Sequence, residues 1–330
     1  METLSPTDTE ARLVDYEPDD DDFQAAVLEG LNRSPKKTLP TKFLYDERGS
    51  TLFDQICETE EYYPTRTEIA IMKEHGASIA ETVGPQALIV EYGSGTSLKT
   101  RLLLKALRAP VAYVPIDIAR RHLLDAAERM QDEFPNIPVF PVCADYMADF
   151  DLPDTGAEAR QTVAYFPGST IGNMEPEIAV RFMRSVVERH GAGSGLLIGV
   201  DLKKDRDTLE AAYNDEAGMT ASFNLNLLHR INRELGGDFD PDAFDFRATY
   251  NPDEGRVESH LISQADQDVR LNGQAFSFDE GEKIHTENSY KYTPDEFADL
   301  AGEAGYAPRR VWTDEDDLFS VQYLVAEREV

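Results

Sequence analysis

The chain has 330 residues, of which 63 are acidic and 32 basic, and its net charge is −31. This charge repels nucleic acid and anionic lipid, so neither is expected as a partner. No apolar stretch approaches the ~20 residues that span a bilayer, and the start of the chain lacks the basic residues of a signal peptide. Only two cysteines occur, and these three observations together indicate a cytoplasmic protein.

The chain opens with a polar segment and a first set of helices. Residues 1–22 end in four consecutive aspartates and are predicted to be a disordered acidic leader. Residues 23–31 have the composition of a short helix, and residues 65–83 that of a longer one. Between them, residues 42–61 alternate aromatic and polar residues without the period of a strand.

From residue 87 onward, short apolar runs alternate with helical patterns. The expected strands are 87–91, 111–116, 138–142, 162–166 and 195–201, and the expected helices are 97–107, 119–132 and 175–190. Strands that alternate with helices predict a parallel sheet with helices on both faces.

The pattern changes after Asp201. The pattern of residues 207–235 predicts one or two helices. Residues 246–283 contain alternating runs interrupted by turn residues, which predicts antiparallel strands outside the main sheet. The last segment returns with a helix at 294–304 and strands at 309–312 and 319–326. A terminal antiparallel hairpin on a parallel sheet is the arrangement of Rossmann-like methyltransferases.

A glycine turn follows the first strand of this sheet. Gly93 and Gly95 let the backbone bend sharply near a ligand, although a glycine pair alone is as often only a tight turn. Asp117 and Asp145 follow the next two strands, where a carboxylate can accept ribose hydroxyls and an acid or its neighbouring amide can meet an adenine amino group. Leu98 stands where a dinucleotide fingerprint has its third glycine, which favours S-adenosylmethionine over NAD.

The loop after the fourth strand reads Phe166-Pro-Gly-Ser-Thr-Ile-Gly-Asn173 and has two interpretations. Asn173 could cap the helix that starts near Glu175, or the loop could face the reacting group; we favour the second, because the loop lies at the ligand edge of the sheet. The six histidines show no metal-ligand spacing, so no metal site is predicted.

Five longer motifs resemble the histidine-specific N-alpha-methyltransferase family of ergothioneine biosynthesis, and the resemblance extends from about Lys42 to the end. They are Tyr45-Asp-Glu-Arg-Gly-Ser-Thr-Leu-Phe-Asp-Gln-Ile56, Glu61-Tyr-Tyr-Pro-Thr-Arg-Thr-Glu68, Glu91-Tyr-Gly-Ser-Gly-Thr-Ser-Leu-Lys-Thr100, Phe166–Asn173 and Ile284-His-Thr-Glu-Asn-Ser-Tyr-Lys-Tyr292.

The resemblance implies transfer of three methyl groups from S-adenosylmethionine to the α-amine of L-histidine, which gives hercynine. It implies that the cofactor is held by Gly93, Lys99, Asp117, Asp145 and Tyr146. It places Tyr62, Asn173 and Tyr213 at the substrate carboxylate, Glu287 and Ser289 at the imidazole, and Tyr45 and Gly168 near the amine. Tyr45, Gly168 and Asn173 are the implied catalytic positions. The sequence departs from the family at two positions: Tyr146 replaces a phenylalanine, which is a mild change, and Ser259 replaces a methionine near the substrate pocket, which leaves side-chain specificity partly open.

The chemistry of these residue types agrees with that reaction. Transfer from a sulfonium needs a neutral amine aimed at the methyl group, and positioning supplies much of the rate. Tyrosine and asparagine donors suit a carboxylate, whereas a lysine or arginine would add charge beside a cationic cofactor. Glu287 and Ser289 are two apart on an extended segment, so both can face one imidazole.

We therefore expect an α/β fold in which a Rossmann-like methyltransferase sheet is joined to a smaller α+β substrate-binding domain, in a monomer. The expected domains are a substrate-binding domain at 23–68 and 203–290 and a methyltransferase domain at 69–202 and 291–330. The alternatives are a methyltransferase acting on another amino acid amine such as a tryptophan derivative, an NAD-dependent oxidoreductase, and a catalytically silent ligand-binding module. The excess of acidic residues also suggests a salt-rich cytoplasm, although an ordinary acidic protein has the same composition.

Overall fold

A computed structural model describes residue 9 and residues 12–16, 21–95 and 98–327. Its backbone separates into two compact units. Unit 1 comprises Met1–Pro18, Pro64–Lys203 and Tyr292–Val330, and unit 2 comprises Asp19–Tyr63 and Lys204–Lys291. These breaks lie near the predicted domain boundaries, and the roles given to the two domains stay predictions.

Unit 1 is built on an eight-stranded sheet of order β1-β5-β4-β3-β6-β7-β14-β13. The strands are β1 (Val14–Asp15), β3 (Ala87–Tyr92), β4 (Ala112–Asp117), β5 (Val142–Cys143), β6 (Gln161–Phe166), β7 (Gly195–Asp201), β13 (Tyr306–Thr313) and β14 (Phe319–Ala326). All neighbours are parallel except β14, which is antiparallel to both β7 and β13. The order reverses at β3, between β4 and β6, and such a reversal is where open α/β sheets bind ligands.

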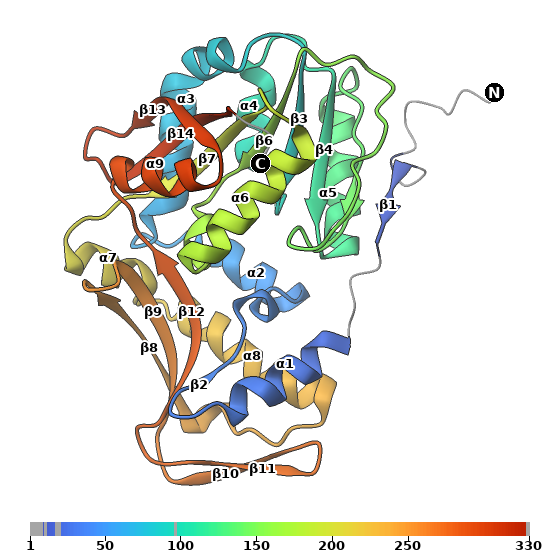
Figure 1. Ribbon diagram of the computed structural model, residues 1–330. Coiled ribbons are helices and arrows are strands. Elements are labelled where there is room, and N and C mark those ends of the chain that lie inside the picture. The colour runs from blue at the N-terminus through green and yellow to red at the C-terminus, as the bar shows by residue number, and fades with distance from the viewer. Residues whose placement is uncertain (1–8, 10–11, 17–20, 96–97, 328–330) are drawn as a thin grey trace. The chain divides into compact units, whose positions relative to one another are not determined.

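Helices cover both faces of this sheet (Figure 1). They are α3 (Tyr63–Val83), α4 (Leu98–Ala106), α5 (Arg120–Glu133), α6 (Pro176–His190) and α9 (Pro294–Glu303), with a 3₁₀ turn, η3, at Thr170–Asn173. The apolar sides of α3, α4 and α5 share one buried cluster with alternate strand residues such as Ile89 and Tyr165. Phe182 of α6 packs against Tyr92 and Phe166, whose side chains point to the opposite face.

Unit 2 contains a four-stranded sheet of order β2-β12-β9-β8 and a separate hairpin of β10 and β11. The strands are β2 (Lys37–Thr38), β8 (Phe244–Asn251), β9 (Arg256–Ser263), β10 (Gln267–Leu271), β11 (Gln274–Phe278) and β12 (Lys283–Tyr290). The helical segments are α1 (Asp21–Asn32), η2 (Thr41–Leu44), α2 (Glu47–Ile56), α7 (Arg206–Tyr213), α8 (Met219–Leu235) and η4 (Pro241–Ala243).

The predicted fold class is confirmed, and two local predictions were wrong. Part of the leader is ordered, because Val14 and Asp15 pair in parallel with β5; residues 1–8, 10–11 and 17–20 lie outside the described part. The third strand is shorter than expected, since Pro138 and Pro141 lack the N–H that a ladder needs.

Residues 42–61, which showed no strand period, carry the helix α2. The Asp46 side chain accepts the Gly49 N–H at 2.7 Å and so caps the first turn. The absence of a strand period in this segment agrees with a helix. Within the described residues, no helix has both the length and the apolar character needed to cross a membrane.

Candidate functional site

The turn after β3 depends on two glycines with positive φ. Gly93 has φ +72° and Gly95 has φ +43°, and L side chains disfavour both conformations. The Gly93 and Ser94 N–H groups donate to the Ile116 carbonyl at 2.9 and 3.2 Å. The turn is thereby fixed against the end of β4, next to Asp117; Thr96 and Ser97 lie outside the described residues.

Asp117 is the last residue of β4 and ties two turns together. Its Oδ2 accepts the Gly95 N–H at 3.4 Å, and its Oδ1 accepts the Ala119 N–H at 3.0 Å. Burial raises the pKa of this carboxyl, while the backbone N–H groups oppose that rise. The carboxylate is held in place by the backbone and keeps lone pairs for hydroxyl donors.

Asp145 and Tyr146 follow β5 at the same edge of the sheet. Asp145 Oδ1 accepts the Met147 N–H at 2.9 Å. The Tyr146 ring lies edge-on to Tyr92 and Phe182, with centroids 6.4 and 5.5 Å apart, and burial raises the pKa of its hydroxyl. Tyr146 also passes close to Gly93, where a Cβ would lie 3.9 Å from its ring.

Three large apolar side chains at this edge are left in water. Leu98, Ile118 and Met147 are 49%, 44% and 43% exposed; Ile118 directly follows β4, and Leu98 and Met147 lie in the segments after β3 and β5. Exposed apolar side chains at the edge of a sheet that also carries hydrogen-bonding groups are typical of a site for an amphipathic ligand. A nucleoside, with an apolar ring and polar hydroxyls, fits that combination.

Glu68, on α3, is a residue of this site to which the sequence reasoning gave no role. It is fully buried, its Oε2 lies 2.5 Å from Lys99 Nζ, and it accepts the Gly168 N–H at 2.9 Å. A Cβ at Gly199 would collide with this carboxylate. The Thr-Glu end of the Glu61–Glu68 motif was the available signal, since a carboxylate inside an apolar helix face needs buried partners.

The loop after β6 holds Gly168 and Asn173. Gly168 has φ +81° and Ser169 φ +57°, and the Ser169 hydroxyl accepts the Asp201 N–H at 3.0 Å. Asn173 ends η3, and the N-cap of α6 is Glu175, which makes no side-chain cap. The interpretation of Asn173 as that cap, which we set aside above, is excluded.

In unit 2 the predicted substrate tyrosines lie among aromatic rings. The Tyr62 and Tyr213 rings meet edge to face with centroids 6.0 Å apart. Tyr45 directly precedes the cap of α2 and packs edge-on against Phe53 and Phe223, at 5.6 and 5.3 Å. Burial raises the pKa of Tyr62 far above its ordinary value, and neighbouring acidic groups, Tyr213 first among them, add to the rise. Tyr62 therefore stays a neutral hydroxyl that can donate.

Glu287 lies on β12 just after a bulge, opposite Ser259 of β9. The bulge brings His285 and Asn288 into contact at 2.7 Å, so these two share a face although they are three apart. Glu287 is 7% exposed, and burial raises the pKa of its carboxyl to about 7 against the opposing charge of Lys291. It is thus poised between its neutral and charged forms near neutral pH.

Ser289 takes part in a buried cluster that also includes a lysine. Its hydroxyl lies 2.8 Å from the Tyr213 hydroxyl, and Lys291 Nζ lies 2.8 Å from each of them. Lys291 is 1% exposed. A lysine thus lies beside Tyr213, and its ammonium is hydrogen-bonded to both hydroxyls, which offsets part of the cost of burying its charge.

The raised pKa of Glu287 predicts a pH-dependent stability. Its carboxyl binds a proton more tightly when folded, so the stabilisation is fully present below pH 4.5 and is lost as the pH rises through about 7. Relative to the unmodified protein, Glu287→Gln should gain up to roughly 3 kcal/mol of unfolding free energy between pH 4.5 and 8. Urea unfolding of both proteins across that range measures the gain. A difference in unfolding free energy between the two proteins that stays constant with pH would contradict the prediction.

The site residues thus fall into two sets. Those expected to hold the cofactor, with Gly168 and Asn173, lie in unit 1 at the ends of parallel strands, and Tyr45, Tyr62, Tyr213, Glu287 and Ser289 lie in unit 2. Among the described residues, no three histidine, cysteine or acidic side chains gather as metal ligands do. The sheet order, the terminal hairpin and the acidic and glycine positions at the sheet edge define a Rossmann-like methyltransferase.

Comparison with known proteins identifies the family. The sequence model described as histidine-specific methyltransferase, SAM-dependent, matches residues 23–326, and the chain belongs to this family. Histidine N-alpha-methyltransferase of Mycolicibacterium smegmatis is 40% identical over 305 residues, covering 91% of this chain and 93% of that protein. The protein of that name from Mycobacterium tuberculosis is 40% identical over 301 residues, covering 89% and 92%. L-tryptophan methyltransferase of Psilocybe serbica is 28% identical over 334 residues, covering 92% and 93%.

Proposed function

We propose that the chain transfers three methyl groups from S-adenosylmethionine to the α-amine of L-histidine, giving hercynine for ergothioneine biosynthesis. The observation that carries this is the presence on β12 of a buried, titratable Glu287 and of Ser289, whose hydroxyl is hydrogen-bonded to Tyr213, in a family specific for histidine. A carboxyl and a hydroxyl on one strand suit the two nitrogens of an imidazole, whereas an indole offers a donor and no acceptor.

The cofactor assignment rests on the geometry of unit 1. S-adenosylmethionine supplies a methyl group on a sulfonium. Asp117 accepts the ribose hydroxyls, the turn at Gly93 brings backbone close to the ligand, and Ile118 and Met147 offer apolar walls to the adenine beside Asp145 and Tyr146. Lys99 serves the carboxylate of the methionine portion.

The acceptor assignment rests on unit 2 and on the loop after β6. Tyr62, Tyr213 and Asn173 donate to the substrate carboxylate, which leaves its amine toward Tyr45 and Gly168. The amine must be neutral at each transfer, and the product carries a permanent cation. The rings of Tyr45, Phe53 and Phe223 pack against one another, and aromatic faces stabilise such a cation.

One experiment tests the proposal directly. The purified chain is incubated with S-adenosylmethionine and, separately, with each of the twenty amino acids, and the products are identified by mass. The expected result is a gain of three methyl groups on L-histidine alone. Methylation of tryptophan in place of histidine would support the alternative substrate class. In separate titrations with S-adenosylmethionine and with NAD, failure to bind S-adenosylmethionine would remove the methyltransferase assignment.

Glu68 is expected to matter for cofactor binding because it serves two donors at once. In Glu68→Gln the amide oxygen can take the place of Oε2, which accepts from both donors, but it has no charge to pair with Lys99, and the NH₂ group then faces the Gly168 N–H from the place of Oε1. The dissociation constant for S-adenosylmethionine should rise roughly five- to tenfold. Calorimetry measures it, with Glu81→Gln, an exposed position on the same helix, as the control. Equal affinities of both variants would show that the Glu68 contacts do not affect the cofactor.

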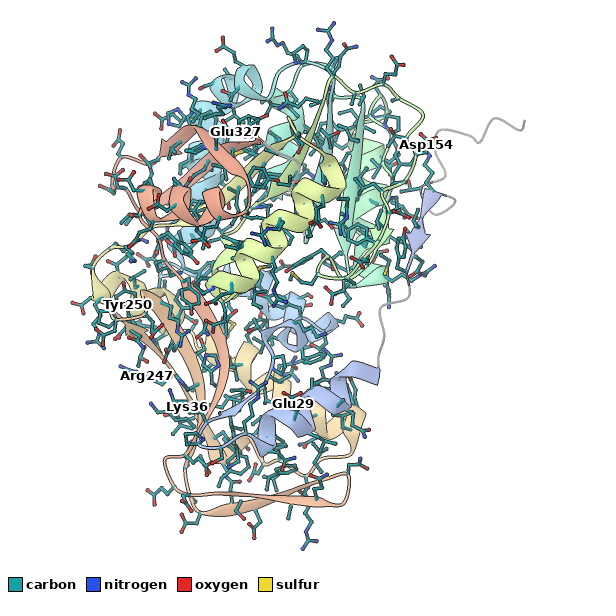
Figure 2. All side chains as sticks on the ribbon, viewed as in Figure 1. Glu29, Lys36, Asp154, Arg247, Tyr250 and Glu327 are labelled. Atoms are coloured by element: carbon teal, nitrogen blue, oxygen red, sulfur yellow. The ribbon has the colours of Figure 1, made fainter. Side chains whose placement is uncertain are left out.

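We also propose a cytoplasmic monomer without nucleic-acid partners, adapted to a salt-rich interior. Acidic side chains such as Glu29, Asp154 and Glu327 project from the ribbon and are exposed (Figure 2). Because salt screens repulsion among such charges, the melting temperature should rise as KCl increases from dilute buffer to molar concentration. A flat or falling curve by circular dichroism would defeat the salt adaptation and leave the enzymatic proposal intact.

A further inference from the structure

The segment after β5 contains residues 145–147, which are proposed to hold the adenine, and the chain, described throughout here, forms no helix or strand before β6. The start of the segment is fixed by the sheet, since the Ala144 N–H donates to the Asp117 carbonyl at 3.1 Å. The Ala148 N–H then donates to the Asp145 carbonyl at 2.9 Å and closes a turn. A segment of this kind needs contacts from other elements to keep a ligand-binding turn in one place.

Arg189, in the last turn of α6, supplies several of these contacts. Its Nε donates to the Phe150 carbonyl at 3.2 Å, and its Nη2 donates to the Ala148 carbonyl at 3.4 Å. The guanidinium carbon lies 4.0 Å from the centre of the Phe150 ring. Its Nη1 donates to the Tyr92 hydroxyl at 3.4 Å, and the Tyr146 ring packs edge to face with Tyr92. The planar guanidinium thus joins the segment to the ring against which Tyr146 packs.

Tyr16 contacts the same segment from the N-terminal strand. It directly follows β1, and its N–H donates to the Cys143 carbonyl at 2.9 Å, which continues the pairing with β5. Its hydroxyl donates to the Asp151 carbonyl at 3.0 Å and accepts the Asp151 N–H at 2.9 Å. Its ring centre lies 5.9 Å from that of Phe150. The Tyr16 hydroxyl therefore holds one residue of the segment through both of its backbone polar groups.

A basic residue at the end of a helix has a common explanation, because a positive charge there interacts favourably with the helix dipole. That interaction depends on charge alone and requires no acceptor from another element. Arg189, in contrast, directs three different nitrogens to three acceptors outside α6 and stacks on Phe150, which is 7% exposed. These contacts indicate a role for Arg189 beyond the helix dipole.

We propose that Arg189 and Tyr16 are positioning residues for the adenine of the cofactor, which hold residues 145–151 so that Asp145 can accept the adenine amino group. This inference rests on the proposed function. It extends the cofactor site to the end of α6 and to the N-terminal strand, which precedes residues 23–326, the part of the chain that the family model matches.

The test compares two nucleobases. S-Inosylhomocysteine carries an oxygen where S-adenosylhomocysteine has the adenine amino group, and a carboxylate cannot accept a hydrogen bond from that oxygen. Calorimetry with the full chain gives the ratio of the two dissociation constants, which should favour S-adenosylhomocysteine by at least about tenfold. This ratio should fall roughly fivefold or more in Arg189→Met and roughly two- to threefold in Tyr16→Phe.

Three comparisons make the result specific. Arg181→Met removes an exposed arginine from the same helix and should leave the ratio unchanged. Arg189→Lys keeps the charge at the helix end but has one nitrogen in place of the guanidinium fork, so its ratio should lie between those of the unmodified chain and Arg189→Met. If circular dichroism shows Arg189→Met unfolded, Tyr16→Phe decides, because it removes one oxygen from a side chain that is 41% exposed.

Each outcome supports or overturns the inference. An unchanged ratio in Arg189→Met or in Tyr16→Phe would overturn the role of that residue, whether the two affinities stay constant or fall together. A ratio fully restored in Arg189→Lys would mean that Arg189 acts through its charge on the helix end, and it would overturn the positioning role.

The unmodified chain separates this inference from the proposed function. If it binds S-adenosylhomocysteine and S-inosylhomocysteine equally well, the segment does not recognise the amino group, and the inference falls while the proposed function stands. If it binds neither of them nor S-adenosylmethionine, the proposed function itself falls.

Discussion

Replacement of Glu287 by alanine is expected to lower kcat/KM for L-histidine by roughly 10²-fold or more. The carboxyl is 7% exposed and its pKa of about 7 lies near the ordinary pKa of an imidazole, so the two can share a proton over the neutral range. Without it, one ring nitrogen enters a buried site unpaired. Steady-state methylation assays over a panel of amino acids should also show a smaller advantage of histidine over apolar side chains.

The matched control is Glu254→Ala, an exposed carboxylate in the turn between β8 and β9 of the same unit, which should leave the kinetics unchanged. S-adenosylmethionine affinity should barely change in either variant. Near-wild-type kcat/KM and full preference for histidine in Glu287→Ala would make the specificity assignment wrong, and tryptophan derivatives would be the next substrates to test.

Asp117→Ala is expected to weaken S-adenosylmethionine binding by at least about tenfold, since each charge-assisted hydrogen bond lost is worth ~1.5–3 kcal/mol. The variant loses the acceptor of the Gly95 N–H as well as the ribose contacts, so the turn after β3 loosens too. Asp117→Asn is the milder change, because its amide oxygen can still accept one of the two backbone N–H groups, that of Gly95 or that of Ala119, while the charge is lost.

Calorimetry provides the affinities and circular dichroism the fold. Asp125→Ala, on the exposed side of α5, is the control for loss of a carboxylate. If Asp117→Ala and Asp117→Asn both bind S-adenosylmethionine as tightly as the unmodified chain, Asp117 does not contact the ribose, and the ligand lies elsewhere along the sheet edge.

The sheet and its order were predictable because the strands of unit 1 are short, apolar and separated by helical patterns. Local composition decides such elements, and β7 was predicted at its observed bounds, 195–201. The third strand was misjudged, since hydrophobicity outweighed two prolines whose missing N–H groups prevent ladder pairing. The pairing of Val14 with Val142 depends on contacts across more than a hundred residues, which no local pattern records.

For the candidate site, motif positions indicated which residues to examine but not what holds them. Glu68 and Lys291 are both buried ions at the end of a recognised motif, and their partners come from other elements. From the sequence, a charged residue in an apolar helix or strand indicates only that its burial costs free energy, and that some partner must offset this cost. Which partner does so is a property of the tertiary structure.

The interleaving of the two units has a consequence for how the chain matures during synthesis. Each sheet needs a strand from the last fifty residues: β14 separates β7 from β13 in unit 1, and β12 lies between β2 and β9 in unit 2. Neither sheet can be completed until that stretch has left the ribosome, so strands that are made earlier keep unpaired edges until then. A nascent chain stalled before residue 283 should therefore depend on chaperones in both halves, and protease resistance should appear in both units together and late.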